Sequence, residues 1–249
     1  MSDLSGKTVL VTGGTRGIGR AVALALAAGG ARVAVHGRRE AAAAEVASLL
    51  GAAGAGTFLA DLATAEAADS LVAEVTAAVP ELNAAVLVAG ADVLTGEPAK
   101  WAFERKLEEL LRVDVTATMK LARALGRWMH DREGGAIVTV GWDQAHAGME
   151  GDSGELFAAV KGSVMAFSRS LARSLAPKVR VNCVAPGWIR TAWGENASEA
   201  WQRRAVRESM LGRWGTPEDI AHAAAWLVSN DAAFVTGQVL AVNGGFRRA

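Results

Sequence analysis

Residues Val9–Arg20 have the sequence VLVTGGTRGIGR. The β-branched and aliphatic residues at its start stop at a pair of glycines, and from Ile18 onward apolar residues recur at helical spacing. The stretch therefore predicts a strand, a tight turn and the start of a helix. Such a turn can bind a pyrophosphate, because glycines let the backbone approach the anion and the helix N-terminus presents unpaired amide groups. A purely structural turn between a strand and a helix is the alternative.

The bulk composition limits the classes of function that the chain can serve. It has 249 residues, of which 51% are hydrophobic and 21% charged, and its formal net charge at pH 7 is +0. This size suits one α/β domain spanning residues 1–249. Because neither sign of charge dominates, we expect a small-molecule substrate and no nucleic-acid or membrane partner.

Cysteine and histidine usage argues against disulfide and metal sites. Cys183 is the single cysteine, which excludes an internal disulfide, and its apolar surroundings are typical of a buried thiol. The histidines are too scattered to predict a metal site. They are His36, His130, His146 and His222. The N-terminal residues are too polar for a secretory signal and no apolar run is long enough to cross a bilayer, which predicts a cytoplasmic protein.

A second predicted strand covers residues 31–39, with the sequence ARVAVHGRR, so the chain opens with a βαβ unit. A carboxylate at the end of this strand would accept hydrogen bonds from an adenosine ribose and repel a 2′-phosphate. The chain instead has Arg38 and Arg39 there, with Arg16 in the facing glycine turn. Guanidinium groups suit a phosphate, which favours NADP(H) over NAD(H). The alternative is that these three arginines are simply exposed to solvent.

The spacing of Thr12, Gly13, Gly17 and Gly19 resembles the cofactor turn of the short-chain dehydrogenase/reductase family. Further matches follow in the family's order over nearly the whole chain. They are Asp61-Leu62, Ala89-Gly90, residues 178–191, residues 213–220 and residues 236–245. The resemblance implies a single-domain Rossmann fold, which is a doubly wound α/β fold with a parallel sheet of seven strands. It also implies a substrate lid around residues 190–212 and a homotetramer, or a homodimer.

The same resemblance implies a set of cofactor-binding residues. An Asp followed by an aliphatic residue contacts adenine in the family, Ala-Gly supports the adenosine ribose, and a Pro-Gly loop faces the nicotinamide carboxamide. The implied residues are Gly13, Thr15, Arg16, Gly17, Ile18, Gly19, Arg38, Asp61, Leu62, Ala89, Gly90, Lys161, Pro186, Gly187, Ile189 and Thr191. Leu87 and Val88 stand where the family has two asparagines that brace the backbone.

The catalytic residues of the family are only partly matched. Phe157 and Lys161 stand where the family has Tyr-x-x-x-Lys, and the chain contains no tyrosine. The family's catalytic serine is replaced by Trp142 when the preceding strand is aligned, or by Gln144 when Lys161 is aligned, and Ser153 lies too far along the loop. A positioned general acid is worth roughly 10²- to 10⁴-fold in rate. Without a substitute for the tyrosine, we expect a poor ordinary ketoreductase.

Three hypotheses about the chemistry remain. The first is an atypical NADP(H)-dependent oxidoreductase whose proton comes from another group, and Asp143 is the best protein candidate because it directly follows a predicted strand. The other candidates are Asp114, which replaces a family asparagine that holds a water, together with His146, Glu155, a water bound to Lys161 and an acidic group on the substrate. The structural alternatives are a paired helix carboxylate for Asp114 and a loop carboxylate bonded to backbone amides for Asp143.

The second hypothesis is a catalytically degenerate NADP(H)-binding subunit or regulator. The third is a non-redox isomerase or lyase in the same crevice, with Asp143 or His146 as base. Trp142, Trp188 and Trp193 are expected on loops around the nicotinamide, where they would form an aromatic pocket for a flat or apolar substrate. Ordinary packing of these tryptophans is the alternative.

Overall fold

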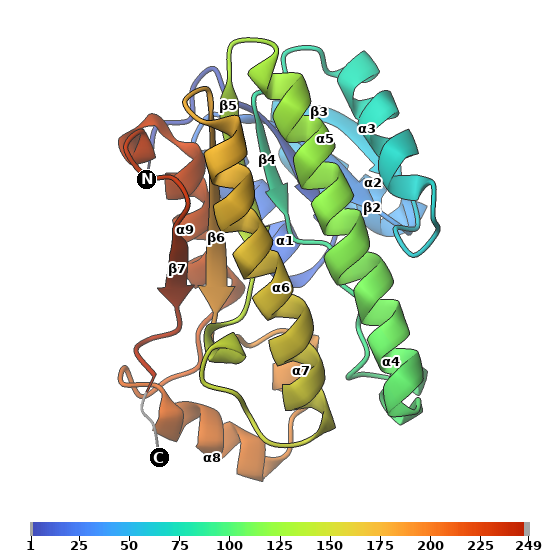
Figure 1. Cartoon of the computed structure of the whole chain (residues 1–249), viewed down its shortest axis with the longest axis vertical. Coiled ribbons are helices and arrows are strands. Elements are labelled where there is room, and N and C mark those ends of the chain that lie inside the picture. Colours follow the sequence, from blue (N-terminus) through green and yellow to red (C-terminus); the bar gives the residue numbers. More distant parts are fainter. Residues whose placement is uncertain (1, 247–249) are drawn as a thin grey trace.

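In the computed structural model, which describes residues 2–246, seven parallel strands form one sheet in the order β3-β2-β1-β4-β5-β6-β7 (Figure 1). The strands are β1 (Thr8–Thr12), β2 (Arg32–Gly37), β3 (Gly54–Leu59), β4 (Ala84–Leu87), β5 (Gly135–Val140), β6 (Val179–Pro186) and β7 (Val239–Val242). The predicted doubly wound sheet of seven strands is therefore confirmed.

Helices cover both faces of the sheet. The α-helices are α1 (Gly17–Ala28), α2 (Glu40–Leu50), α3 (Ala67–Ala78), α4 (Phe103–Leu110), α5 (Thr118–His130), α6 (Asp152–Leu175), α7 (Ala192–Glu195), α8 (Glu199–Glu208) and α9 (Pro217–Val228). Shorter helical segments are η1 (Gly51–Ala53), η2 (Glu97–Lys100), the π-helical η3 (Leu111–Ala117), η4 (Asp143–Ala145) and η5 (Asn230–Ala232). One hydrophobic cluster joins α1, α2 and α9 to the sheet, and a second joins α3, α5 and α6 to its other face.

The central strands are mostly apolar because both of their faces are covered. In β1, Val9 and Val11 pack into the cluster under α1 and α9, whereas Leu10 packs into the cluster under α3 and α5. Successive side chains of a strand point to opposite faces, so a continuous apolar run supplies both cores. This alternation explains why the run before the glycine turn is buried over its whole length.

The order of the strands reverses between β1 and β4, which places a crevice at their carboxyl ends. Figure 1 shows α7 and α8 beyond the carboxyl ends of β6 and β7. These two helices lie within residues 190–212, where the lid is expected. The fold therefore gathers the glycine turn and the loops after β4, β5 and β6 on one side of the sheet.

Two local features bear on the sequence analysis. Helix α9 starts with Pro217 after Thr216, and the Thr216 hydroxyl accepts from the Asp219 amide while the Asp219 carboxylate accepts from the Thr216 amide.

The helical region after β4 is not one regular helix. It is interrupted at η3, where one turn is π-helical. Such turns occur mostly as single interruptions of α-helices and often at functional sites.

Candidate functional site

The glycine turn is a site of close backbone contact. Gly13 has φ of +65°, and a Cβ atom there would lie 2.8 Å from the Cα atom of Ala89. A Cβ atom on Gly19 would lie 2.1 Å from the Gly13 carbonyl oxygen. Only glycine fits at these two positions, so the turn brings the start of α1 against both β1 and the loop after β4.

The N-terminus of α1 can accept an anion. The Arg16 side chain makes no capping hydrogen bond in the described structure, and the first turn of α1 contains no acidic residue. Amide groups at an uncapped helix N-terminus are donors in need of a partner, and the helix dipole favours a negative charge there. The turn therefore fits a pyrophosphate on its own geometry.

The His36 ring contacts the backbone of the glycine turn, a role that the sequence analysis missed. Its Nδ1 atom accepts a hydrogen bond from the Gly13 amide at 3.3 Å, and its Nε2 atom lies 3.1 Å from the Ala60 carbonyl oxygen. Burial lowers the pKa of His36, which favours the neutral ring that these two contacts require. Its position at the end of β2, facing the glycine turn, was the available signal.

A pocket of about 160 Å³ lies beside the glycine turn. It brings together half of the predicted cofactor residues, namely Gly13, Thr15, Arg16, Arg38, Asp61, Leu62, Ala89 and Gly90. It is also lined by residues that the sequence analysis did not single out for binding, namely His36, Gly37, Ala91, Asp92, Pro98, Trp101, Glu109 and Val113. The structure thus places the glycine turn and the ends of β2, β3 and β4 around one cavity.

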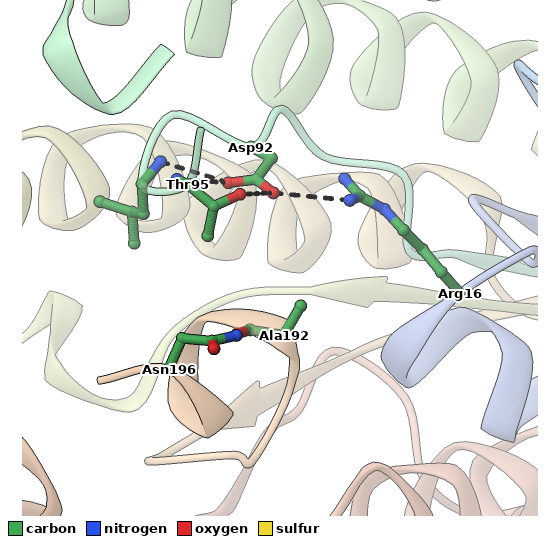
Figure 2. A network of polar contacts seen from close by, with 6 residues as sticks. Arg16, Asp92, Thr95, Ala192 and Asn196 are labelled. Atoms are coloured by element: carbon green, nitrogen blue, oxygen red, sulfur yellow. Dashed lines mark hydrogen bonds and ion pairs between the residues drawn. The ribbon is translucent and has the colours of Figure 1, made fainter. Parts of the chain in front are cut away.

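Arg16 reaches across this pocket to the loop after β4. Its Nη1 atom lies 3.5 Å from the Oδ2 atom of Asp92, which Thr95 in turn holds (Figure 2). Arg38 lines the same pocket and is exposed. Two guanidinium groups therefore face one cavity, whereas Arg39 does not line it.

The other predicted cofactor residues do not line this pocket. Thr191, in the loop after β6, lies beside the glycine turn, because its Cγ2 atom would be 3.7 Å from a Cβ atom on Gly17. Pro186 ends β6 and is buried. The Gly187 amide donates to the Val242 carbonyl oxygen. Ile189 packs in the hydrophobic core.

The backbone after β4 is held without the two asparagines of the family. Leu87 is buried, the Ala89 amide donates to the Thr12 hydroxyl at 3.2 Å, and the Ala91 amide donates to Asp114 at 2.8 Å. Aliphatic packing and two side-chain acceptors therefore brace this loop.

Lys161 and Asp114 form an ion pair beside the loop after β4. The π-helical turn η3 carries Asp114, whose side chain is 2% exposed, and α6 carries Lys161, whose side chain is 14% exposed. Their Oδ1 and Nζ atoms lie 2.7 Å apart. Asp114 is thus a paired helix carboxylate, and its other oxygen is the acceptor for the Ala91 amide.

Phe157 lies one helical turn before Lys161 on α6. Its ring packs edge-on against Trp142, with the ring centroids 6.4 Å apart. The side chain is half-buried, so part of the ring faces open space. At the point where the family resemblance implies a tyrosine hydroxyl, this helix presents a ring without an exchangeable proton.

Asp143 begins the short η4 helix directly after β5. Its Oδ2 atom accepts a hydrogen bond from Asn243 at 3.0 Å, and its Oδ1 atom is buried. Burial raises the pKa of Asp143 to about 6, although the Asn243 side chain and the backbone amides of Gln144 and Asp143 oppose this rise. A Cβ atom on Gly187 would lie 3.3 Å from the Oδ2 atom, so Asp143 lies against the loop after β6.

The other candidate donors have different surroundings. Gln144 is buried, and its Nε2 atom has no hydrogen-bond partner in the described part of the chain. His146 and Glu155 are exposed, and Ser153 is half-buried at the start of α6. Among these side chains, Asp143 alone combines partial burial with a carboxyl group that can hold a proton near neutral pH.

The predicted aromatic pocket is divided into two groups. Trp142 pairs with Phe157, whereas Trp188 and Trp193 stack on each other with their ring centroids 6.0 Å apart. The latter two also pack against Trp201 of the lid and against Trp214, which follows the lid. Packing among these four tryptophans therefore accounts for Trp188 and Trp193, and Trp142 is the one whose ring contacts Phe157.

Arg204 of α8 joins this lid to the loop before α6. Its guanidinium lies 2.7 Å from Glu208 and 2.6 Å from Glu150, and Glu208 also accepts from the Trp188 indole at 2.8 Å. The Arg204 guanidinium further lies over the Trp201 ring. One side chain thus links two carboxylates and the tryptophan cluster.

Residues 2–246 contain no helix long and apolar enough to span a lipid bilayer. The same residues contain no cluster of three or more His, Cys, Asp or Glu side chains placed to hold a metal ion.

Known reductases are similar to this chain over nearly its whole length. A family model described as Enoyl-(Acyl carrier protein) reductase matches residues 13–247. The chain is 33% identical over 245 residues to the 3-oxoacyl-(acyl-carrier-protein) reductase FabG of Escherichia coli (strain K12), with 98% of each protein covered.

Two solved structures have the same fold. One is the 3-oxoacyl (acyl-carrier-protein) reductase of Agrobacterium tumefaciens C58 with NADP bound, at 29% identity and a TM-score of 0.88, with 98% of this chain and 95% of that chain covered. The other is a short-chain dehydrogenase/reductase from Serratia marcescens BCRC 10948, at 31% identity and a TM-score of 0.87, with 98% of each chain covered. Because these matches span the sheet, the glycine turn and the crevice, the protein belongs to the short-chain dehydrogenase/reductase family.

Proposed function

We propose that this protein is an atypical NADP(H)-dependent oxidoreductase that transfers a hydride to or from a small carbonyl or alcohol substrate. The observation that carries the proposal is the uncapped N-terminus of α1, which opens beside the guanidinium groups of Arg16 and Arg38. This arrangement suits a nucleotide that bears both a pyrophosphate and a 2′-phosphate. When bound, the nicotinamide supplies or accepts the hydride.

We assign the parts of the cofactor to the residues as follows. The amide groups at residues 17–19 bind the pyrophosphate, and Arg16 and Arg38 bind the 2′-phosphate. Asp61 and Leu62 contact the adenine, and Ala89 and Gly90 support its ribose. Lys161, held by Asp114, donates hydrogen bonds to hydroxyls of the nicotinamide ribose. The backbone of Pro186, Gly187, Ile189 and Thr191 faces the carboxamide.

We propose that Asp143 supplies the proton that tyrosine supplies in the family. A pKa of about 6 leaves a substantial fraction of the carboxyl protonated in weakly acidic solution. We assign to Gln144, whose Nε2 atom lacks a partner in the described chain, the role of donating a hydrogen bond to the substrate oxygen. Asp114 positions Lys161 and takes no proton itself in this scheme.

Two of the three relatives named above are 3-oxoacyl-(acyl-carrier-protein) reductases, so 3-oxoacyl thioesters are the first substrates to test. The exposed part of the Phe157 ring and its contact with Trp142 favour an apolar or aromatic group next to the reacting carbon. A screen therefore includes 3-oxoacyl thioesters of several chain lengths and aryl ketones.

The test begins with titration of the purified protein with NADPH and with NADH, followed by tryptophan emission and by calorimetry. We expect binding of NADPH to be at least tenfold tighter than binding of NADH.

Asp143→Asn should then bind NADPH normally and reduce the best substrate of the screen at least 100-fold more slowly. Lys161→Ala is the control that weakens nucleotide binding itself. Failure of the wild-type protein to bind either nucleotide contradicts the proposed function, and full turnover by Asp143→Asn contradicts the proton assignment alone.

We further propose a homotetramer, on the basis of the family resemblance. Light scattering combined with gel filtration measures the mass in solution. A mass four times that of the 25.7 kDa chain supports this assembly, and a mass of one chain contradicts it.

A further inference from the structure

The loop after β4 places a carboxylate in the pocket that we assign to the adenosine end of the cofactor. Asp92 lies opposite Arg16 across this pocket, and the two side chains come from segments 76 residues apart in the sequence. Figure 2 shows Arg16 extending from the start of α1 toward the Asp92 carboxylate. No role in the proposed reaction accounts for an anion at this place.

Asp92 is held firmly by its own loop. Its Oδ1 atom accepts hydrogen bonds from the amides of Leu94 and Thr95 at 3.2 and 3.1 Å, and its Oδ2 atom accepts from the Thr95 hydroxyl at 2.6 Å. Burial raises the pKa of this carboxyl, but the hydrogen bonds from Thr95 and Leu94 and the charge of Arg16 outweigh burial and lower the pKa overall. Asp92 is therefore an ordered anion at neutral pH.

Arg16 is held much less firmly than Asp92. Its side chain is 53% exposed, and its contact with Asp92 is long, at 3.5 Å. Exposed ion pairs of this kind are weak. A phosphate group can accept two parallel hydrogen bonds from one guanidinium, which is a stronger interaction. Arg16 is thus the partner that can exchange one anion for another.

The pocket carries more negative than positive side chains, so it suits a phosphate group only if Arg16 leaves Asp92 and pairs with the phosphate. Two guanidinium groups, on Arg16 and Arg38, face three carboxylates, on Asp61, Asp92 and Glu109. Of these three carboxylates, Asp92 forms an ion pair with Arg16, one of the two arginines assigned to the 2′-phosphate. A 2′-phosphate that takes Arg16 leaves Asp92 without its cationic partner and beside a second anion.

We propose that Asp92 is a specificity-determining residue that competes with the 2′-phosphate of NADPH for Arg16 and so reduces the preference of this protein for NADPH over NADH. The inference rests on the proposed function, because it assigns the 2′-phosphate to Arg16. It predicts that the preference is set by three groups, with Arg16 and Arg38 favouring the phosphate and Asp92 opposing it.

The test is the variant Asp92→Asn, which keeps the acceptor oxygen for the loop amides and removes the charge. The matched control is Glu109→Gln, which removes a carboxylate from the same pocket that has no ion pair with Arg16 in the described structure. Calorimetry measures the dissociation constants of NADPH and NADH for each protein, and thermal unfolding checks that each variant is folded.

We expect Asp92→Asn to bind NADPH about three- to tenfold more tightly and to change NADH binding by less than about twofold. Glu109→Gln should change the ratio of the two constants by less than about twofold. In an Arg16→Ala background, Asp92→Asn should give a smaller gain for NADPH than it gives in the wild-type protein.

Unchanged or weaker NADPH binding by Asp92→Asn overturns the inference, and so does an equal gain for both nucleotides. An equal effect of Glu109→Gln also overturns it, because the total charge of the pocket would then explain the result. These outcomes leave the proposed function intact as long as the wild-type protein binds NADPH. A wild-type protein that binds no nucleotide overturns both proposals.

Discussion

The Lys161 ammonium and the Asp114 carboxylate lie 2.7 Å apart where α6 crosses the π-helical turn η3. Removal of one partner of a buried ion pair is costly because the other charge is left uncompensated. We therefore expect Asp114→Ala to lower the free energy of unfolding by about 3 kcal/mol. Asp114→Asn should cost less, since its amide oxygen still accepts from the Ala91 amide. Urea denaturation measures both changes.

The double variant Asp114→Ala/Lys161→Ala is the control for that prediction. It removes both charges, so it should be more stable than Asp114→Ala alone if the unpaired ammonium causes the loss. A double variant as unstable as the sum of both single variants would show that packing, rather than charge, is responsible.

The raised pKa of Asp143 makes a second prediction, about stability and pH. Its folded-state pKa of about 6 lies above the ordinary value of 3.8. The folded protein thus binds this proton more tightly than the unfolded chain, and the Asp143 contribution to stability falls as the pH rises from about 4 to about 6. Asp143→Asn should remove that fall and gain at most about 3 kcal/mol above pH 6, with no gain near pH 4. Urea denaturation at a series of pH values measures the difference.

Glu133→Gln is the matched control for Asp143, because it neutralises an exposed carboxylate. It should show no comparable difference between acidic and neutral pH. If Asp143→Asn gains equally at all pH values, burial of the charge is not the cause.

Phe157→Tyr makes a third prediction, about catalysis. It places a hydroxyl on the helix face of Lys161, one turn away. If proton donation limits the rate and a tyrosine hydroxyl donates more effectively than Asp143, we expect carbonyl reduction with NADPH to be faster, by up to roughly 10²- to 10⁴-fold. The rate of NADPH absorbance loss measures the change. Phe167→Tyr on the same helix is the control and should be neutral, and equal rates for both variants would show that a different step limits turnover.

Arg204→Met makes a fourth prediction, about the lid. The change leaves the buried Glu208 carboxylate with Trp188 as its remaining donor among the contacts described above. We expect the lid to open more often, so that chymotrypsin cleaves within residues 188–214 roughly tenfold faster, which corresponds to ~1.4 kcal/mol. Arg203→Met is the control, because Arg203 is exposed and pairs with Glu199 on the same helix. Equal cleavage of the two variants would contradict the role of Arg204.

The sequence predicts the sheet well because its central strands are buried on both faces. In β1 and β5, apolar runs end at glycine-bearing turns, and those breaks coincide with the ends of the strands in the structure. The start of α9 has an equally local signal, since the N-cap Thr216 directly precedes Pro217 at the first helical position. Signals of this local kind do not depend on how distant segments pack.

The candidate site is less predictable because its contacts join distant segments. Asp92 pairs with Arg16 across 76 residues, and nothing near Asp92 in the sequence indicates that partner. Asp114 illustrates the same limit, because its role depends on whether Lys161 or a water reaches it. The tryptophans divide into two groups for a similar reason, since Trp188 and Trp193 meet Trp201 and Trp214 only when the lid folds over the loop after β6.

The π-helical turn η3 joins two helices, α4 and α5, that pack into different hydrophobic clusters. Before η3, Leu110 of α4 packs with Val93 and Leu156. After it, Leu121 and Leu125 of α5 pack into the cluster that joins α3, α5 and α6 to the sheet. The extra residue in the turn rotates the two halves relative to each other. Deletion of one residue there would restore a regular helix, and either α4 or α5 would then turn its apolar stripe toward solvent. The width of this turn therefore sets how far the apolar face of α4 is rotated relative to that of α5.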